Sequence, residues 1–193
     1  MCNSHDPKDL SRRHFGALML AGAATSVVPA AAKTAEECPK VTKVPALGVM
    51  CIDYRLPTAG VDFFNTHLGT KGYDIVALAG ATLAAGSPKA FKKTVEAFYE
   101  QVHAAWTLHR IEKVVFLDHM DCGAFKVEFN EACNFKPPHE ELHYHRLMVD
   151  IVSEEFPRRI AAMGLPKIGL DFWIFMDPAN PVATPLKGKD PRP

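Results

Sequence analysis

The amino-acid sequence predicts a single α/β domain, in which helices flank a mostly parallel sheet of four or five strands. Two observations lead to this fold class. Short apolar runs recur along the chain between polar residues or glycines, as expected for strands that are buried on both faces. Between them lie stretches whose apolar residues recur every three or four positions, which indicates amphipathic helices. Strands that alternate with helices favour a parallel sheet with right-handed crossovers.

Four apolar runs are expected to form the strands: residues 44–51, 74–78, 112–117 and 168–176. The expected helices are residues 61–68, Ser87 through His109, Cys122 to about Cys133, and 140–163. Gly69 suits the end of the first helix because glycine readily adopts the left-handed conformation found there. Ser87 and Pro88 suit the start of the second helix, as a capping residue followed by a proline in the first turn.

Residues 1–32 are expected to be a twin-arginine signal peptide, followed by a linker or arm at residues 33–43. The pair Arg12-Arg13 precedes an apolar run, and Ala30-Ala31-Ala32 then offers a small-residue cleavage site. That run is too short to span a bilayer, which needs about 20 residues. The alternative is a retained N-terminal helix or anchor. The sequence therefore predicts a folded protein exported to the periplasm or beyond, with no stable membrane span in its mature form.

The charge balance excludes some classes of partner. Lys and Arg together number 22, as do Asp and Glu, so the formal net charge is zero. Nucleic-acid-binding domains usually show a basic excess, which is missing here, and the expected partner is a small-molecule substrate. The domain itself is expected to cover residues 44–178, and residues 179–193 to form a Pro-rich tail with little structure.

Two short motifs point to a metal site. Cys51 follows the first expected strand, and His119-Met120-Asp121-Cys122 follows the third. Ligand sites in parallel α/β sheets lie outside the carboxyl ends of the strands, where both motifs fall. Two thiolates and one imidazole are typical ligands of a zinc ion whose fourth position is open. The alternative is that both cysteines are inert core residues.

Asp53 and Arg55 follow Cys51 closely, and they are candidate catalytic residues. Asp53 either takes the fourth zinc position or orients a water molecule bound there. The guanidinium of Arg55 can hold a carboxylate through two parallel hydrogen bonds, which would keep Asp53 off the metal. The alternative for this pair is an ordinary ion pair in a turn.

The remaining cysteines and histidines leave alternatives open. Cys38 and Cys133 can pair in an oxidising compartment or stay as free thiols. A second cluster, His139, His143 and His145, is interpreted as a solvated helix start, with a proton relay or a second metal site as alternatives. His109 is expected to be a core or interface residue rather than a ligand.

Taken together, Cys51-x-Asp53-x-Arg55 and His119-x-x-Cys122-Gly123 resemble the signature of the β-class carbonic anhydrases. The resemblance is good over residues 44–129 and weaker at 169–175, which resemble the closing edge strand of that family. It implies that Cys51, His119 and Cys122 bind Zn²⁺, with Asp53 and Arg55 as a gating dyad. The implied reaction is hydration of CO₂ to bicarbonate by zinc-bound hydroxide, in a homodimer or higher homo-oligomer. Alternatives on the same fold are hydrolysis of carbonyl sulfide or carbon disulfide (COS/CS2), and a non-catalytic zinc-binding protein.

The sequence departs from that family pattern in three places. Ala77-Leu78-Ala79-Gly80 replaces the common Arg-Asn-Ala-Gly, so its polar half is lost. The long N-terminal helical arm is missing or reduced to residues 33–43. Tyr54 stands where the family often has a small residue. These changes leave the metal ligands intact and bear on catalytic rate, substrate and dimer geometry.

Overall fold

The computed structural model describes residues 42–69, 72–87, 89–129 and 138–188 of the 193-residue chain. The expected signal peptide at 1–32 and nearly all of the arm at 33–43 lie outside these residues. So do Cys38 and Cys133, whose pairing therefore stays a prediction.

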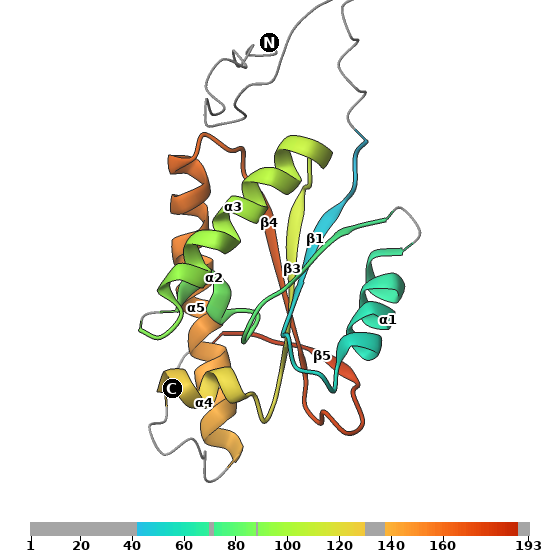
Figure 1. Cartoon of the computed structure of the whole chain (residues 1–193), viewed down its shortest axis with the longest axis vertical. Coiled ribbons are helices and arrows are strands. Elements are labelled where there is room, and N and C mark those ends of the chain that lie inside the picture. The colour runs from blue at the N-terminus through green and yellow to red at the C-terminus, as the bar shows by residue number, and fades with distance from the viewer. Residues whose placement is uncertain (1–41, 70–71, 88, 130–137, 189–193) are drawn as a thin grey trace, which may run out of the picture. The chain divides into compact units, whose positions relative to one another are not determined.

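Five strands form one sheet, in the order β2-β1-β3-β4-β5 (Figure 1). Its parallel part consists of β1 (Ala46–Met50), β2 (Asp74–Ala77), β3 (Lys113–His119) and β4 (Gly169–Phe175). The fifth strand, β5 (Ala183–Pro185), pairs antiparallel with β4. The prediction of a mostly parallel α/β sheet is confirmed, and each expected strand is present.

The Pro-rich tail is more structured than expected, because β5 lies within it. Trp173 and Ile174 of β4 pair with Pro185 and Thr184, and the Leu186 side chain is buried against Ile174. Pro185 is tolerated because β5 is an edge strand, which needs fewer backbone donors than a central one. The sheet therefore extends past residue 178, the predicted end of the domain.

The helices are α1 (Pro57–Leu68), α2 (Leu83–Gly86), α3 (Lys92–His109), α4 (Gly123–Phe129) and α5 (Pro138–Ala162). The first helix begins at Pro57 rather than at 61, because proline is well suited to the first helical turn. The short helix α2 was not expected. Ser87 ends α2 rather than starting α3, and its hydroxyl accepts a hydrogen bond from the Phe91 N–H.

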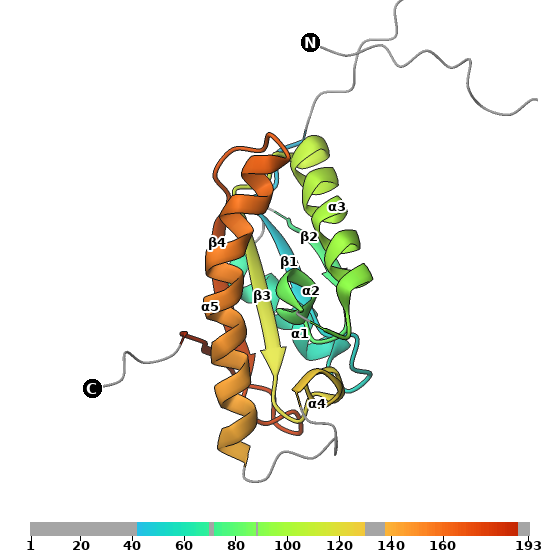
Figure 2. The same ribbon diagram turned by 90° about the vertical axis from the view of Figure 1, so that its left-hand side faces the viewer.

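Helices cover the sheet on both faces (Figures 1 and 2). Helix α1 lies on one face, and α2, α3 and α5 lie on the other. Successive strand residues alternate between these layers. Val114 and Phe116 pack into the core under α3 and α5, whereas Val115 and Leu117 pack under α1. Both faces of β3 are therefore buried, which explains its continuous apolar sequence.

No helix in the described part of the chain combines the length and the apolar character that a membrane crossing requires.

Candidate metal centre

The three expected metal ligands meet at the carboxyl ends of two neighbouring strands. Cys51 directly follows β1, and His119 is the last residue of β3. Because β1 and β3 are hydrogen-bonded neighbours in a parallel sheet, these two positions lie side by side. Cys122 comes from the short loop between β3 and α4. All three side chains are buried.

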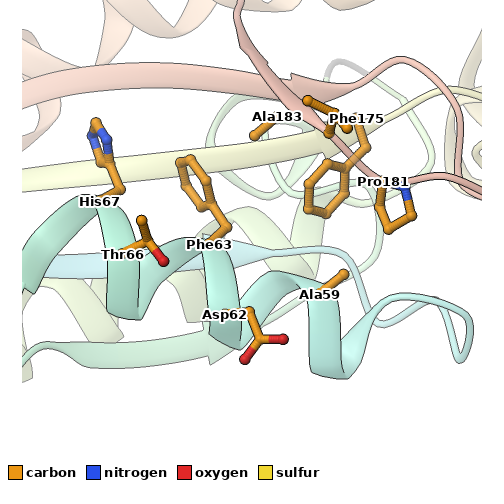
Figure 3. A pocket seen from close by; sticks show the side chains of 9 residues that line it. Ala59, Asp62, Phe63, Thr66, His67, Phe175, Pro181 and Ala183 are labelled. Carbon is orange, nitrogen blue, oxygen red and sulfur yellow. The ribbon is translucent and has the colours of Figure 1, made fainter.

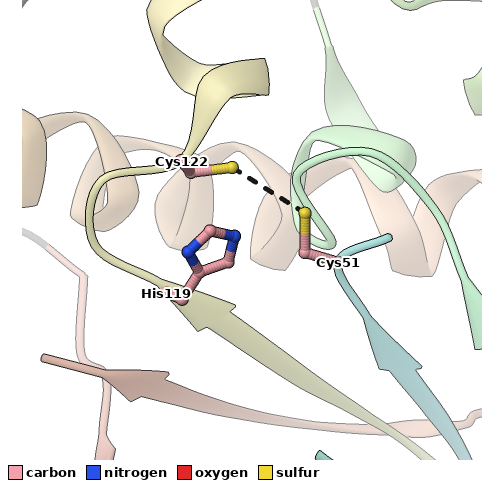
Figure 4. Close-up of side chains that lie close together, drawn as sticks. All are labelled: Cys51, His119 and Cys122. Atoms are coloured by element: carbon pink, nitrogen blue, oxygen red, sulfur yellow. Dashed lines mark hydrogen bonds between the residues drawn. The ribbon is translucent and has the colours of Figure 1, made fainter. Parts of the chain in front are cut away.

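Their geometry fits one metal ion. One ligand atom from each of Cys51, His119 and Cys122 lies within 4.8 Å of the others. The two sulfur atoms are 3.9 Å apart, and Figure 4 shows the imidazole turned toward them. Two Zn–S bonds of about 2.3 Å at a tetrahedral angle would separate the sulfurs by about 3.8 Å. The ligand set therefore needs little movement to accept a zinc ion.

The tautomer of the His119 imidazole suits a metal ligand. Its Nδ1 lies 2.8 Å from the Met120 carbonyl oxygen, which can only accept, so Nδ1 carries the proton. The lone pair is thereby left on Nε2, which is buried and finds no hydrogen-bond partner in the described part of the chain. A buried imidazole nitrogen without a partner is costly unless something binds it. A metal ion would satisfy it, and the fixed tautomer is typical of metal-binding histidines.

The Cys51 and Cys122 side chains also share a hydrogen bond. The hydrogen bond with Cys122 holds the pKa of the Cys51 thiol well below its ordinary value. The same contact, together with burial, raises the pKa of Cys122 well above its ordinary value. One sulfur is thus ionised more readily than the other, as expected for two thiols that share a proton. A divalent cation would favour two thiolates here by neutralising both charges.

Gly80, which is not among the predicted site residues, supports Cys51 from the loop after β2. Its N–H donates to the Cys51 sulfur at 3.4 Å. The φ angle of Gly80 is +72°, and a Cβ there would lie 2.6 Å from Leu83 Cδ1, so a side chain would be both strained and crowded. The glycine of the altered Ala77-Leu78-Ala79-Gly80 stretch therefore contacts Cys51, one of the expected ligands. Tyr54, another departure from the family pattern, is 88% exposed.

Asp53 and Arg55 form the pair that their spacing predicted. Arg55 Nε donates to Asp53 Oδ1 at 2.9 Å, and Nη2 donates to Oδ2 at 2.8 Å. These bonds lower the pKa of Asp53 to about 2. Its Oδ2 also lies 3.8 Å from His119 Nε2, so the carboxylate stands at the edge of the ligand set. The structure thus brings both candidate catalytic residues beside the three ligands.

Asp121 is a further residue of the centre that sequence reasoning missed. Its carboxylate accepts from Arg55 Nη1 at 2.8 Å, and its carbonyl oxygen accepts from Nη2 at 3.0 Å. Lys126 contacts the same carboxylate. Arg55 therefore links the loop that carries Cys51 to the loop that carries Cys122, which an ordinary ion pair within one turn would not do.

The histidine cluster is only partly as expected. His143 is exposed, in line with a solvated helix start. For His145 that interpretation is wrong, because its side chain is fully buried and its Nδ1 lies 2.8 Å from Asp118 Oδ2. The side chain of His139 lies outside the described part of the chain. His109 is half-buried, and its Nδ1 lies 2.8 Å from Asp74 Oδ1, which ties the end of α3 to β2.

A separate cavity of about 720 Å³ lies between α1 and the β4–β5 end of the sheet (Figure 3). Its lining is mainly apolar and includes Phe63, His67, Phe175 and Val182. None of the three ligands, nor Asp53 or Arg55, lines it. The candidate metal centre and this cavity are therefore distinct features of the fold.

Comparison with known proteins gives the family. Residues 41–154 match the model of a family described as "Putative carbonic anhydrase". The chain belongs to this family. A protein of Rickettsia conorii described as uncharacterized is 33% identical over 129 residues, or 64% of this chain and 67% of that protein. A similarly described protein of Rickettsia bellii is 31% identical over 129 residues, covering 64% and 76% of the two chains.

The family match covers every residue of the centre. Cys51, Asp53, Arg55, His119 and Cys122 all lie inside the matched residues. The carbonic anhydrase family and the Cys-His-Cys group that could hold a metal therefore coincide on one part of the chain.

Proposed function

We propose that this protein is a β-class carbonic anhydrase, which binds one Zn²⁺ through Cys51, His119 and Cys122 and hydrates CO₂ to bicarbonate. The observation that supports this most directly is the convergence of three buried ligand atoms within 4.8 Å, one of them an imidazole nitrogen without a partner. The chain's membership of a carbonic anhydrase family supports the choice of reaction.

In this proposal the protein supplies ligands, orientation and a fixed acceptor. When bound, Zn²⁺ acidifies a water molecule, so that an oxygen nucleophile is available near neutral or alkaline pH. Asp53 Oδ2, at the edge of the ligand set, accepts a hydrogen bond from the attacking water and orients it. Arg55 holds both carboxylate oxygens and so keeps Asp53 off the metal. The water oxygen bonds to the carbon of CO₂, one proton leaves to solvent, and bicarbonate is released.

The substrate assignment is tested by measuring two reactions on one preparation. Full-length protein purified without chelator, with its zinc content measured, is mixed with CO₂ in a stopped-flow instrument, and separately with carbonyl sulfide. We expect CO₂ hydration that becomes faster as pH rises, because the nucleophile is the deprotonated water. Zinc-loaded protein that hydrolyses only the sulfur compound would make it a COS or CS₂ hydrolase. Zinc-loaded protein that is inactive on both substrates would support the non-catalytic alternative.

From the sequence alone we also infer export through the twin-arginine route, with cleavage near Ala32. Replacing Arg12 and Arg13 by lysine is expected to keep full-length protein inside a bacterium that has this route. The matched control is the same double change at Arg158 and Arg159, which are exposed on α5 and should not affect export. Cell fractionation with immunoblotting measures the outcome. Mature protein that still leaves the cell after the Arg12/Arg13 change would mean that another route is used.

A further inference from the structure

Three buried polar side chains lie next to the loop between β3 and α4, which carries Cys122, and take no part in the proposed reaction. Asp118, Glu141 and His145 are 1%, 4% and 0% exposed. Asp118 belongs to β3, whereas Glu141 and His145 lie one turn apart on α5. Burying charged groups is costly unless they are paired and hydrogen-bonded. Their contacts therefore indicate what they hold in place.

Glu141 holds the backbone of the loop that carries Cys122. The Asp121 N–H donates to Glu141 Oε2 at 2.9 Å, and the Cys122 N–H donates to Oε1 at 2.7 Å. The φ angle of Asp121 is +57°, which residues with a side chain seldom adopt. One carboxylate thus binds two successive amides at the point where the loop takes an unfavourable conformation, and it fixes the direction in which Cys122 leaves the backbone.

Asp118 helps to position the other two ligands, His119 and Cys51. It directly precedes His119, and its carboxylate accepts hydrogen bonds from the Thr82 N–H at 3.0 Å and the Thr82 hydroxyl at 2.7 Å. Thr82 lies in the turn that begins at Gly80, whose N–H donates to the Cys51 sulfur. The Leu83 N–H closes this turn by donating to the Gly80 carbonyl oxygen. Asp118 therefore joins the strand that ends in His119 to the turn that contacts Cys51.

His145 lies between the two carboxylates. Its Nδ1 is 2.8 Å from Asp118 Oδ2, and its Nε2 is 3.8 Å from Glu141 Oε1. The ring packs on Phe125, with centroids 3.7 Å apart, which fixes its position between β3 and α4. Complete burial lowers the pKa of His145, but the contacts with Asp118 and Glu141 outweigh this and raise it above its ordinary value. A protonated His145 would balance the carboxylate charge buried on either side of it.

We propose that Asp118, His145 and Glu141 are positioning residues, which preset the metal ligands without touching the metal or the substrate. Each ligand is held through different contacts. Glu141 binds the backbone amides at Asp121 and Cys122. Asp118 directly precedes His119, and it also binds Thr82 in the turn whose Gly80 contacts Cys51. The inference rests on the proposed function only in requiring that the Cys-His-Cys group binds a metal, and not in requiring CO₂ hydration.

Metal release from full-length protein tests this. In Glu141→Gln one carboxylate oxygen becomes an NH₂ group, so one of the two loop amides loses its acceptor. Zinc-loaded protein is mixed with an excess of a chromogenic chelator, and Co²⁺-substituted protein is examined for thiolate-to-metal and d–d absorption. We expect zinc to leave Glu141→Gln about 10- to 100-fold faster, the usual effect of changing a partner of a metal ligand, with an altered Co²⁺ spectrum. The control Glu154→Gln, at an exposed pair with Arg158 on the same helix, should match the wild type.

The melting temperature of each metal-free variant separates positioning from mere stability. A variant that melts earlier but keeps the wild-type Co²⁺ spectrum and zinc release would overturn the proposal, because the residue would then stabilise only the fold. If Glu141→Gln does not fold, Thr82→Val decides, because it removes one hydrogen bond to Asp118 at nearly constant volume. We expect about fivefold faster release, the factor that one hydrogen bond usually contributes, and wild-type release would overturn the proposal. Zinc-loaded wild type without CO₂ hydration would instead contradict the proposed function alone.

Discussion

Cys51→Ser is expected to lose most of its bound metal and, with it, any turnover. A serine hydroxyl stays protonated near neutral pH and is a poor zinc ligand, whereas the thiolate is a strong one. The change also removes the sulfur that accepts the Gly80 N–H and lies 3.9 Å from Cys122 Sγ. We expect zinc affinity to fall by more than about 100-fold, beyond the range typical of changes to partners of ligands.

Elemental analysis after gel filtration, and competition with a chelator, measure this loss. Cys133→Ser is the matched control: it makes the same chemical change at a cysteine outside the proposed ligand set, and zinc content should stay at the wild-type level. If Cys51→Ser retained a full equivalent of zinc with wild-type affinity, the assignment of Cys51 as a ligand would be wrong.

Asp53→Ala has the second large expected effect, and it should separate turnover from metal binding. Asp53 is not one of the three grouped ligands, so the variant should keep its zinc. It removes the carboxylate that accepts a hydrogen bond from the attacking water, and loss of a positioned acceptor usually costs about 10²-fold or more in rate. Arg55→Ala should also keep zinc and lose rate, because it frees Asp53 from the two bonds that hold it and lets the carboxylate reach the metal.

The measurement is kcat/KM for CO₂ hydration at equal zinc content. Asp62→Ala is the control: this aspartate is exposed on α1, so its replacement should leave kcat/KM unchanged. Wild-type rates in both Asp53→Ala and Arg55→Ala would mean that the pair only links two loops. If Asp53→Ala lost zinc along with rate, Asp53 would instead be placed among the ligands.

The closeness of the candidate ligands Cys51 and His119 could be predicted, because it follows from a rule about strand ends. Apolar runs located β1 and β3, and parallel pairing brings the ends of neighbouring strands together, so Cys51 and His119 had to be close. The spacing between Asp53 and Arg55 is equally local, and their hydrogen bonds formed as expected. In both cases the information lies within a few residues or within the pairing of two strands.

The supporting residues could not be predicted, because they act across long stretches of sequence. Glu141 binds an amide 19 positions away, and His145 contacts Asp118 at a separation of 27. Within a run of His and Glu, His145 looks like part of a solvated helix face, and only the packing of α5 on β3 and α4 buries it. Strand β5 was missed for a similar reason, since Pro185 and the nearby Pro181 indicate a loop until β4 provides an edge for pairing.

Metal titration with simultaneous rate measurement tests the central claim most directly. Metal-free full-length protein receives increasing amounts of zinc, and CO₂ hydration is followed at alkaline pH after each addition. We expect the rate to rise in proportion to bound zinc and to level off at one equivalent per chain, and Cys51→Ser to show no such rise. A wild-type protein that takes up one equivalent without gaining hydration activity, or that takes up no zinc, would contradict the central claim.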